Sequence, residues 1–337
     1  LEIMKTMNTK NVLMANRFFI MLFATAMVFT SCDSNDDSSS QSYVPSSTAF
    51  NSIREIALDN NTQTFQINAA NGMTTLTSAN GVELDINANC LTLNGNAVTG
   101  MIDIEYVEIF EGGQMLVTDK TTMGKLPNGD MAMLISGGAF YINATKNGQQ
   151  LDLSCGMNLR IPANLTAPDN DMILWDGTID AKGDLVWEQQ DPTTGQGGVF
   201  LEQGAAGQTY YAFFNSFGWT NVDKFYNFIG PKTQILAGVP TGYNYGNSAV
   251  YLHYDGEGNA LAKLDTYDSV SGLFSEHYGQ IPVGLACHII FATEENGQWR
   301  YAIKPVTISA NAVYTFTLAE TTLGSEAQLV AAMNALP

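Results

Sequence analysis

Apolar and polar residues alternate along much of the chain. They alternate strictly from Val82 to Asn87, with the period of two that is typical of a strand with one buried and one exposed face. Met101 to Phe110 begins with the same alternation, but its parity changes at Tyr106-Val107, where we expect a β-bulge to restore burial. Both segments favour antiparallel sheet, in which one face is commonly buried and the other exposed.

Turn signals agree with this pattern. Four Asn-Gly pairs lie between apolar runs, as in tight β-hairpins. They are Asn94-Gly95, Asn128-Gly129, Asn147-Gly148 and Asn296-Gly297. Short strands spaced by Gly and Asn predict a mainly β chain built of β-sandwiches, in preference to a barrel or a βαβ sheet.

Only two segments have helical periodicity. Thr48 to Leu58 places Phe50, Ile53 and Ala57 on one face, with Thr48 as a possible cap, although a strand could equally begin there. Near the end of the chain, Ser325 is expected to cap a short amphipathic helix. That helix has Leu329, Met333 and Leu336 on one face.

The first 31 residues have the proportions of a secretory signal peptide. Lys10 and Arg17 precede an uncharged apolar run from residue 18 to 29, which is too short to span a bilayer stably. Thr30-Ser31-Cys32 closes this segment. The polar, acidic composition of the next residues predicts a disordered tether over 32–48.

Phe29-Thr30-Ser31-Cys32 resembles the lipobox of bacterial lipoproteins, with Phe in place of the usual Leu. The resemblance implies that Cys32 becomes the lipidated first residue of the mature chain. The acidic cluster after it resembles the surface-export signal of Bacteroidota lipoproteins, which implies a lipid-anchored protein of the outer membrane that is exposed at the cell surface. In other Gram-negative groups, Asp33 beside the cysteine would instead favour retention at the inner membrane.

The mature length of about 300 residues predicts two domains. A turn-rich segment from Pro162 to Pro168 suggests a first β-sandwich over 49–165 and a second over 166–337. Segments 65–67, 136–142 and 217–225 (Phe-Gly-Trp-Thr-Asn-Val-Asp-Lys-Phe) resemble uncharacterised Bacteroidota surface lipoproteins, with a layout similar to ZU5-like domains. This resemblance implies two Ig-like or ZU5-like sandwiches and supplies no catalytic residues.

The net charge of −19 argues against nucleic acid or an anionic lipid surface as a partner. Residues 1–31 hold three of the 14 Lys and Arg and one of the 33 Asp and Glu, so the remainder carries a net charge of −21. After Cys32 the chain has only Cys90, Cys155 and Cys287. A Cys90–Cys155 bridge is possible after export, but the spacing favours small buried thiols.

No catalytic or metal-binding motif stands out. The three histidines lack the spacing of a metal site, and His288 is expected to be a hydrogen-bonded core residue. Acidic pairs such as Glu188 with Asp191, or Asp255 with Glu257, have the side chains of a glycosidase, but a chain this acidic offers many such pairs. Residues 255–259 and 180–184 could ligate calcium, yet they lack the full loop spacing. We therefore predict neither an enzyme nor a cofactor.

Aromatic residues are the best candidates for ligand binding. Tyr210 to Phe228 is rich in aromatic side chains, including Trp219, which form either a core or a stacking surface for sugar or peptide. The loop Tyr243-Asn244-Tyr245 has a composition suited to adaptable recognition. We predict Trp219, Tyr243 and Tyr245 as ligand contacts of a non-catalytic binding or structural module of the cell envelope. The alternatives are a glycan-binding protein of a nutrient-uptake system and an adhesin or fimbrial subunit.

Overall fold

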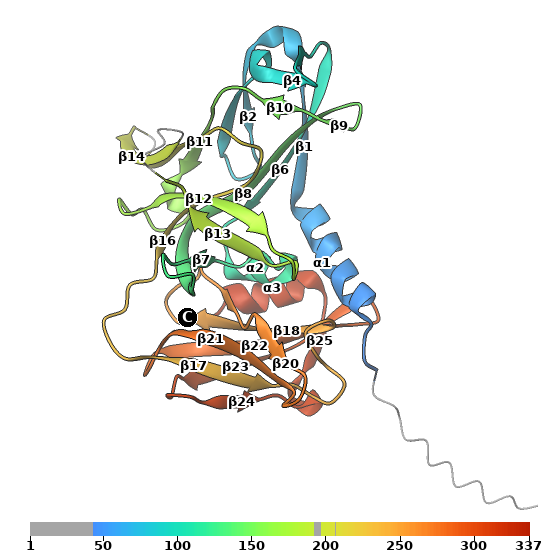
Figure 1. Cartoon of the computed structure of the whole chain (residues 1–337), viewed down its shortest axis with the longest axis vertical. Helices are drawn as coiled ribbons and strands as arrows, with labels where there is room; N and C mark the ends of the chain where they lie inside the picture. Colours follow the sequence, from blue (N-terminus) through green and yellow to red (C-terminus); the bar gives the residue numbers. More distant parts are fainter. Residues whose placement is uncertain (1–42, 192–196, 206) are drawn as a thin grey trace, which may run out of the picture. The chain divides into compact units, whose positions relative to one another are not determined.

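The computed structural model describes residues 43–337 except 192–196 and 206 (Figure 1). The chain is mainly β, with 52% strand and 15% helix, as the alternation predicted. The predicted signal peptide and Cys32 lie outside the described residues. Within the part that the structure describes, no helix has the length and apolar character needed to cross a bilayer.

Two sheets, A and B, are built from the residues before 226. Sheet A contains β1 (Thr62–Asn68), β6 (Met101–Ile109), β7 (Met123–Lys125), β8 (Met131–Lys146), β9 (Gln149–Gln150), β12 (Ile173–Ile179), β13 (Leu185–Gln189) and β16 (Gly218–Phe225). Sheet B contains β14 (Gly198–Gly204), β15 (Gly207–Phe214), β11 (Met157–Pro162), β3 (Glu83–Asn87) and β2 (Met73–Thr77). In both sheets, strand pairing crosses residue 165, where the boundary between two domains was expected.

Three further sheets complete the described chain. The small sheet C contains β10 (Asp152–Leu153), β4 (Leu91–Leu93) and β5 (Asn96–Ala97). Sheet D contains β20 (Thr266–Asp268), β21 (Leu273–Pro282), β17 (Lys232–Gly238) and β24 (Val313–Thr315). Sheet E contains β19 (Ala262–Lys263), β18 (Ser248–Tyr254), β22 (Ala286–Glu295), β23 (Gln298–Thr307) and β25 (Thr322–Gly324).

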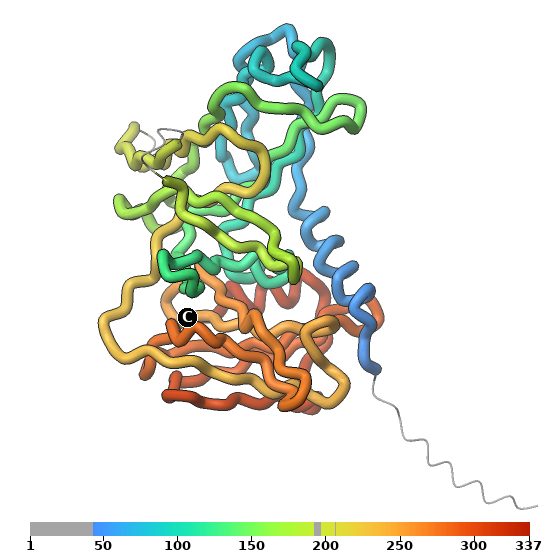
Figure 2. The backbone as a smooth tube through the Cα atoms, viewed as in Figure 1, coloured from blue at the N-terminus to red at the C-terminus, as the bar shows by residue number. Residues whose placement is uncertain are grey.

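The three helices contribute to one of the two hydrophobic clusters of the described chain. They are α1 (Ser47–Asn61), α2 (Gly112–Thr118) and α3 (Glu326–Asn334), with short 3₁₀ turns at Ala69–Asn71, Ala88–Cys90, Ala163–Leu165 and Leu318–Glu320. Their buried side chains form one cluster with residues of sheets A and E. In the tube view α2 and α3 lie side by side, and α1 runs past α2 (Figure 2). Another side of α1, which includes Asn51, Glu55 and Leu58, borders a hollow.

Both helices expected from the sequence are present. Phe50, Ile53 and Ala57 are the buried residues of α1, as predicted, but the cap is Ser46, whose side chain accepts a hydrogen bond from the Ala49 amide at 3.1 Å. Thr48 is therefore inside the helix. Ser325 caps α3 in a capping box, as expected.

The bulge expected at Tyr106-Val107 is wrong. The pairing of β6 with β1 and with β8 runs through these residues without a register shift. Tyr106 is buried in one hydrophobic cluster, and Val107 is buried in the other. The parity of the sequence changes because β6 passes between two cores, so both of its faces are buried in its second half.

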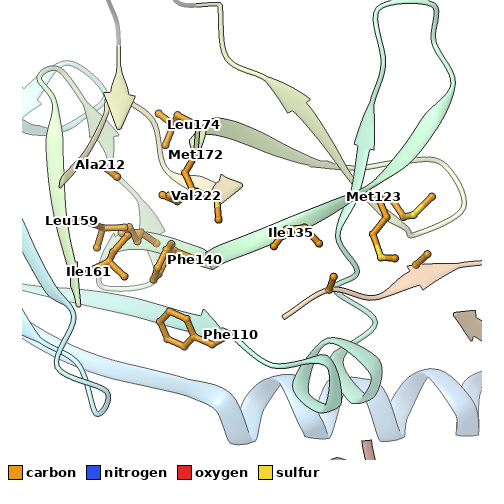
Figure 3. Close-up of a cluster of buried hydrophobic side chains, with 14 of the residues drawn as sticks. Phe110, Met123, Ile135, Phe140, Leu159, Ile161, Met172, Leu174, Ala212 and Val222 are labelled. Carbon is orange, nitrogen blue, oxygen red and sulfur yellow. The ribbon is translucent and has the colours of Figure 1, made fainter. Parts of the chain in front are cut away.

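Sheets A and B bury their facing side chains against each other. Figure 3 shows this cluster, with Phe140 and Val222 from sheet A close to Leu159, Ile161 and Ala212 from sheet B. All five residues are fully buried. One face of sheet B is therefore committed to the core, and its alternate residues are directed away from that core.

All four Asn-Gly pairs lie in hairpins, as predicted, because Asn128-Gly129 also joins two antiparallel strands, β7 and β8. Asn94, Asn147 and Asn296 have φ between 50° and 53°, and each is followed by a glycine at positive φ, as a two-residue type I′ turn requires. These turns join β4 to β5, β8 to β9 and β22 to β23. At Asn128-Gly129 only the glycine has positive φ.

Cys90 and Cys155 form a disulfide, with their Cα atoms 5.6 Å apart. The expectation of free buried thiols is wrong for this pair, because the sequence spacing of 65 residues gave no hint that β3 and β11 pair and bring both cysteines together. Cys287 is a free, buried thiol, as expected. Burial raises the pKa of this thiol to about 12.

Candidate functional site

The outer face of sheet B is the best candidate for a ligand-binding surface. Alternation along the strands buries Leu84, Leu159 and Ala212 and leaves the residues between them on the opposite face. Strand register then aligns these outward residues in two rows. One row runs Phe200, Tyr211, Arg160 and Glu83, and the other runs Gly198, Phe213, Asn158, Asp85 and Thr75.

Exposed aromatic rings occupy one end of this face. Phe200 is 59% exposed and Phe213 is 43% exposed, and their ring centroids are 6.2 Å apart in an edge-to-face arrangement. Gly198 pairs directly with Phe213 and has no side chain to cover it. Two large apolar rings are therefore presented to solvent side by side, although most residues of this kind are buried in this chain.

The other end of the face carries a held array of polar groups. Arg160 donates from Nε to Glu83 at 2.7 Å and from Nη1 to Asp85. Asp85 also accepts from the Thr75 hydroxyl at 2.6 Å and from the Asn158 amide at 3.3 Å. Burial alone would raise the pKa of Asp85, but these hydrogen bonds and the guanidinium charge outweigh it and lower the pKa. Asp85 is thus ionised, and its hydrogen-bond partners are held in place before any ligand arrives.

One acceptor of this array is unsatisfied. Asn158 Oδ1 is buried and has no hydrogen-bond partner among the described residues. Buried polar atoms are normally paired, and a ligand donor is one explanation for such an exception. Asn158 lies beside both Phe213 and Asp85 in the sheet, so that donor would come from a molecule already in contact with the aromatic ring.

A hollow of about 750 Å³ covers these residues. Its walls include Phe200, Phe213, Asn158, Arg160 and Asp85, so both ends of the face border one space. This volume is within the range of small-molecule sites, which combine apolar walls with a few placed polar groups. The geometry suits a ligand that has an apolar face and several hydroxyl groups.

The three predicted contact residues lie elsewhere. Tyr243 is 2% exposed, packs against Phe291 with ring centroids 5.4 Å apart and donates to the Tyr43 carbonyl, so its ring has no free face. Trp219 and Tyr245 are half-buried and border two adjoining hollows beside α1. Cys32, the predicted lipidation site, is outside the described residues.

Sequence reasoning missed Phe200 and Arg160 as site residues and left Phe213 open between a core and a stacking surface. In Tyr210 to Phe214, Tyr210 and Phe214 are buried, whereas Phe213 is exposed. These five residues are all apolar or aromatic, so their sequence does not show which of them face the core and which face solvent. Only the pairing of β15 with β11 and β14 shows which rings share a face with Arg160.

The acidic pairs considered for hydrolysis take other partners. Glu188 pairs with Lys125 at 2.7 Å, and Asp255 lies 2.7 Å from Nδ1 of His288. Asp180 in the 180–184 segment accepts two backbone hydrogen bonds within its own turn. Among the residues that the structure describes, no group of three or more His, Cys, Asp or Glu is placed to hold a metal ion.

Comparison with family models, with curated proteins and with solved structures gave no match to this chain.

Proposed function

We propose that this chain is a non-catalytic, lipid-anchored protein of the outer membrane, exposed at the cell surface, that binds an oligosaccharide on the outer face of sheet B. The observation that carries the proposal is that the exposed rings of Phe200 and Phe213 lie on the same face of sheet B as the hydrogen-bonded Arg160–Asp85–Asn158 array. A sugar ring has an apolar C–H face that packs on aromatic rings, and its hydroxyl groups pair with charged and amide side chains.

The export and anchoring part of this proposal has separate support. A disulfide such as Cys90–Cys155 persists in oxidising compartments outside the cytoplasm. The strongly negative charge disfavours a nucleic-acid partner. We further propose that sheets A and B, and sheets D and E, are the two β-sandwiches of a Bacteroidota-type surface lipoprotein. The support is that, within the described chain, no strand from residues 62–225 pairs with a strand from residues 232–324.

Replacing Phe213 by Ala is expected to weaken oligosaccharide binding about tenfold or more, because truncation of a central aromatic contact usually costs more than 1 kcal/mol. Replacing Arg160 by Met should do the same through loss of hydrogen bonds. The full-length protein, purified in detergent, would be screened on a glycan array, and the affinity for the best hit measured by calorimetry.

Val313→Ala is the matched control, because Val313 is 52% exposed on β24 of sheet D, a strand that does not border this hollow. It should leave the affinity unchanged. A glycan hit whose affinity survives both Phe213→Ala and Arg160→Met would contradict the proposed site. Binding of a pilin-like peptide in place of any glycan would favour the fimbrial alternative.

Replacing Cys32 by Ser is expected to move the protein from the detergent phase to the aqueous phase in a phase-partitioning experiment. Acyl chains contribute roughly 0.8 kcal/mol per buried methylene, and the proposed anchor depends on this one thiol. Incorporation of labelled palmitate should be lost in parallel. If the Cys32→Ser protein still partitions into detergent, the anchor is not at Cys32.

A further inference from the structure

A cleft runs along α1, away from the sheet B face. It consists of two adjoining hollows of about 310 Å³ and about 510 Å³, whose walls share Leu58, Lys120 and Gly183. The walls come from α1, from the end of α2 and from the turn between β12 and β13. None of the residues lining the sheet B hollow borders this cleft.

Basic residues are concentrated in the smaller hollow. Arg54, Lys120, Lys182 and Lys263 line it, and they are four of the eleven Lys and Arg in residues 43–337. The whole chain carries a net charge of −19, so a group of four basic residues contrasts with the negative charge of the chain. An anion approaching this acidic protein is attracted to few places of this kind.

Two of these cations are already neutralised. Arg54 pairs with Asp119 at 3.1 Å, and Lys263 pairs with Asp119 at 2.8 Å and with Asp184 at 2.5 Å. Two positive and two negative charges balance in this group. The remaining acid in the wall, Glu55, is exposed.

The other two cations have no carboxylate partner among the described residues. Lys120 Nζ donates to the Thr118 carbonyl at 3.2 Å, and Lys182 Nζ donates to the Asp265 carbonyl at 2.9 Å. Burial lowers the pKa of Lys120, and an anionic ligand beside the ammonium would offset that cost. With four cations set against Asp119, Asp184 and Glu55, this hollow has a net charge of +1, and Lys120 and Lys182 are its two cations outside the ion-pair network.

The larger hollow adds an aromatic surface and hydroxyl partners. Trp219 and Tyr141 line it with ring centroids 5.3 Å apart, and Lys120 Nζ lies 5.9 Å from the centre of the Trp219 ring. Asp59 and Glu105 on the same wall can accept hydrogen bonds from hydroxyl groups. A ligand that bridges the hollows needs an acidic group at one end and a hydroxyl-rich ring at the other.

We propose that this cleft is a second binding site, for an acidic sugar of an anionic glycan, with its negative group between Lys120 and Lys182 and its ring against Trp219. A uronate and a sulfated sugar share this chemistry. The site is independent of the sheet B face, so either can fail without the other.

The test is calorimetric titration of the full-length protein in detergent with three oligosaccharides of matched length and one bare anion. The oligosaccharides are oligogalacturonate, which carries only carboxylates, a κ-carrageenan oligosaccharide, which carries only sulfates, and neutral malto-oligosaccharide; the bare anion is inorganic sulfate. We expect one of the two acidic probes to bind, with an affinity that falls as NaCl is raised. Lys120→Met, Lys182→Met and Trp219→Ala should each weaken that binding about tenfold or more. Which acidic probe binds identifies the negative group as carboxylate or sulfate.

Lys232→Met is the matched control, because Lys232 is an exposed lysine on β17 that does not border the cleft, and it should leave the affinity unchanged. Lys182 is exposed in a turn, so its variant should fold even if Lys120→Met does not. The proposal is overturned if neither acidic probe binds, if the neutral probe binds equally well, or if Lys182→Met leaves binding intact. Inorganic sulfate binding as tightly as the sulfated sugar would also overturn it, since the Trp219 surface would then contribute nothing.

Discussion

Replacing Lys263 by Met is expected to lower the free energy of unfolding by about 3–5 kcal/mol, because removal of one partner leaves buried charge uncompensated. Lys263 is 5% exposed and is the only cation paired with both Asp119 and Asp184 among the described residues. Without Lys263, the ion-pair partner left to Asp119 is Arg54, and Asp184 loses its ion pair with Lys263. Urea unfolding of the purified protein would measure the change.

The loss of stability caused by Lys263→Met should become smaller as the pH falls. Burial would raise the pKa of Asp119, but the charges of Arg54 and Lys263 outweigh it and hold that pKa well below its usual value. A depressed folded-state pKa adds stability above the unfolded pKa near 4, and this stability is lost as the pH falls through the folded pKa. The difference between the wild-type protein and Lys263→Met should therefore be large at pH 7 and shrink in acid.

Lys125→Met provides the comparison. Lys125 and Glu188 form an ion pair at 2.7 Å, but their side chains are 46% and 54% exposed. Exposed pairs contribute about 0–1 kcal/mol. If both variants lose the same small amount, the buried network beside α1 contributes no more to stability than a solvated pair does.

Strands with one buried and one exposed face were predicted well from the sequence. Residues 82–87 and the Asn-Gly turns at 147 and 296 follow local rules, since alternation and left-handed Asn-Gly pairs depend only on neighbouring residues. Helix α2 was not predicted. Its Met115, Leu116 and Val117 are all fully buried, so the seven residues show no amphipathic period that distinguishes a helix from a strand.

The two proposed binding sites were not visible in the sequence for a different reason. Arg160 and Glu83 are 77 residues apart, and Lys263 and Asp119 are 144 residues apart. Their partners are chosen by strand register and by helix packing, and no local pattern encodes either. The aromatic residues were recognised as candidates, but composition did not show which rings are accessible. Tyr243, a predicted ligand contact, is buried, whereas Phe213 is exposed.

Removing the Cys90–Cys155 disulfide by a double Cys→Ala substitution is expected to lower the free energy of unfolding by about 2–4 kcal/mol. The bond joins residues 65 positions apart, so its loss restores much conformational entropy to the unfolded chain. Unfolding in urea with and without dithiothreitol would measure this. Reductant should destabilise the wild-type protein by a similar amount and leave the double variant unaffected.

The same substitution tests whether the disulfide also supports the sheet B face. Cys155 directly precedes Gly156, Met157 and Asn158, which line the hollow over that face. Cys287→Ala is the control, because it removes a buried thiol that forms no disulfide and should not change sensitivity to reductant. If the double variant unfolds at the wild-type urea concentration, the bond adds no stability. If it is less stable but binds the same glycan equally well, strand pairing of β11 with β3 and β15 is sufficient to hold Asn158 and Arg160 in place.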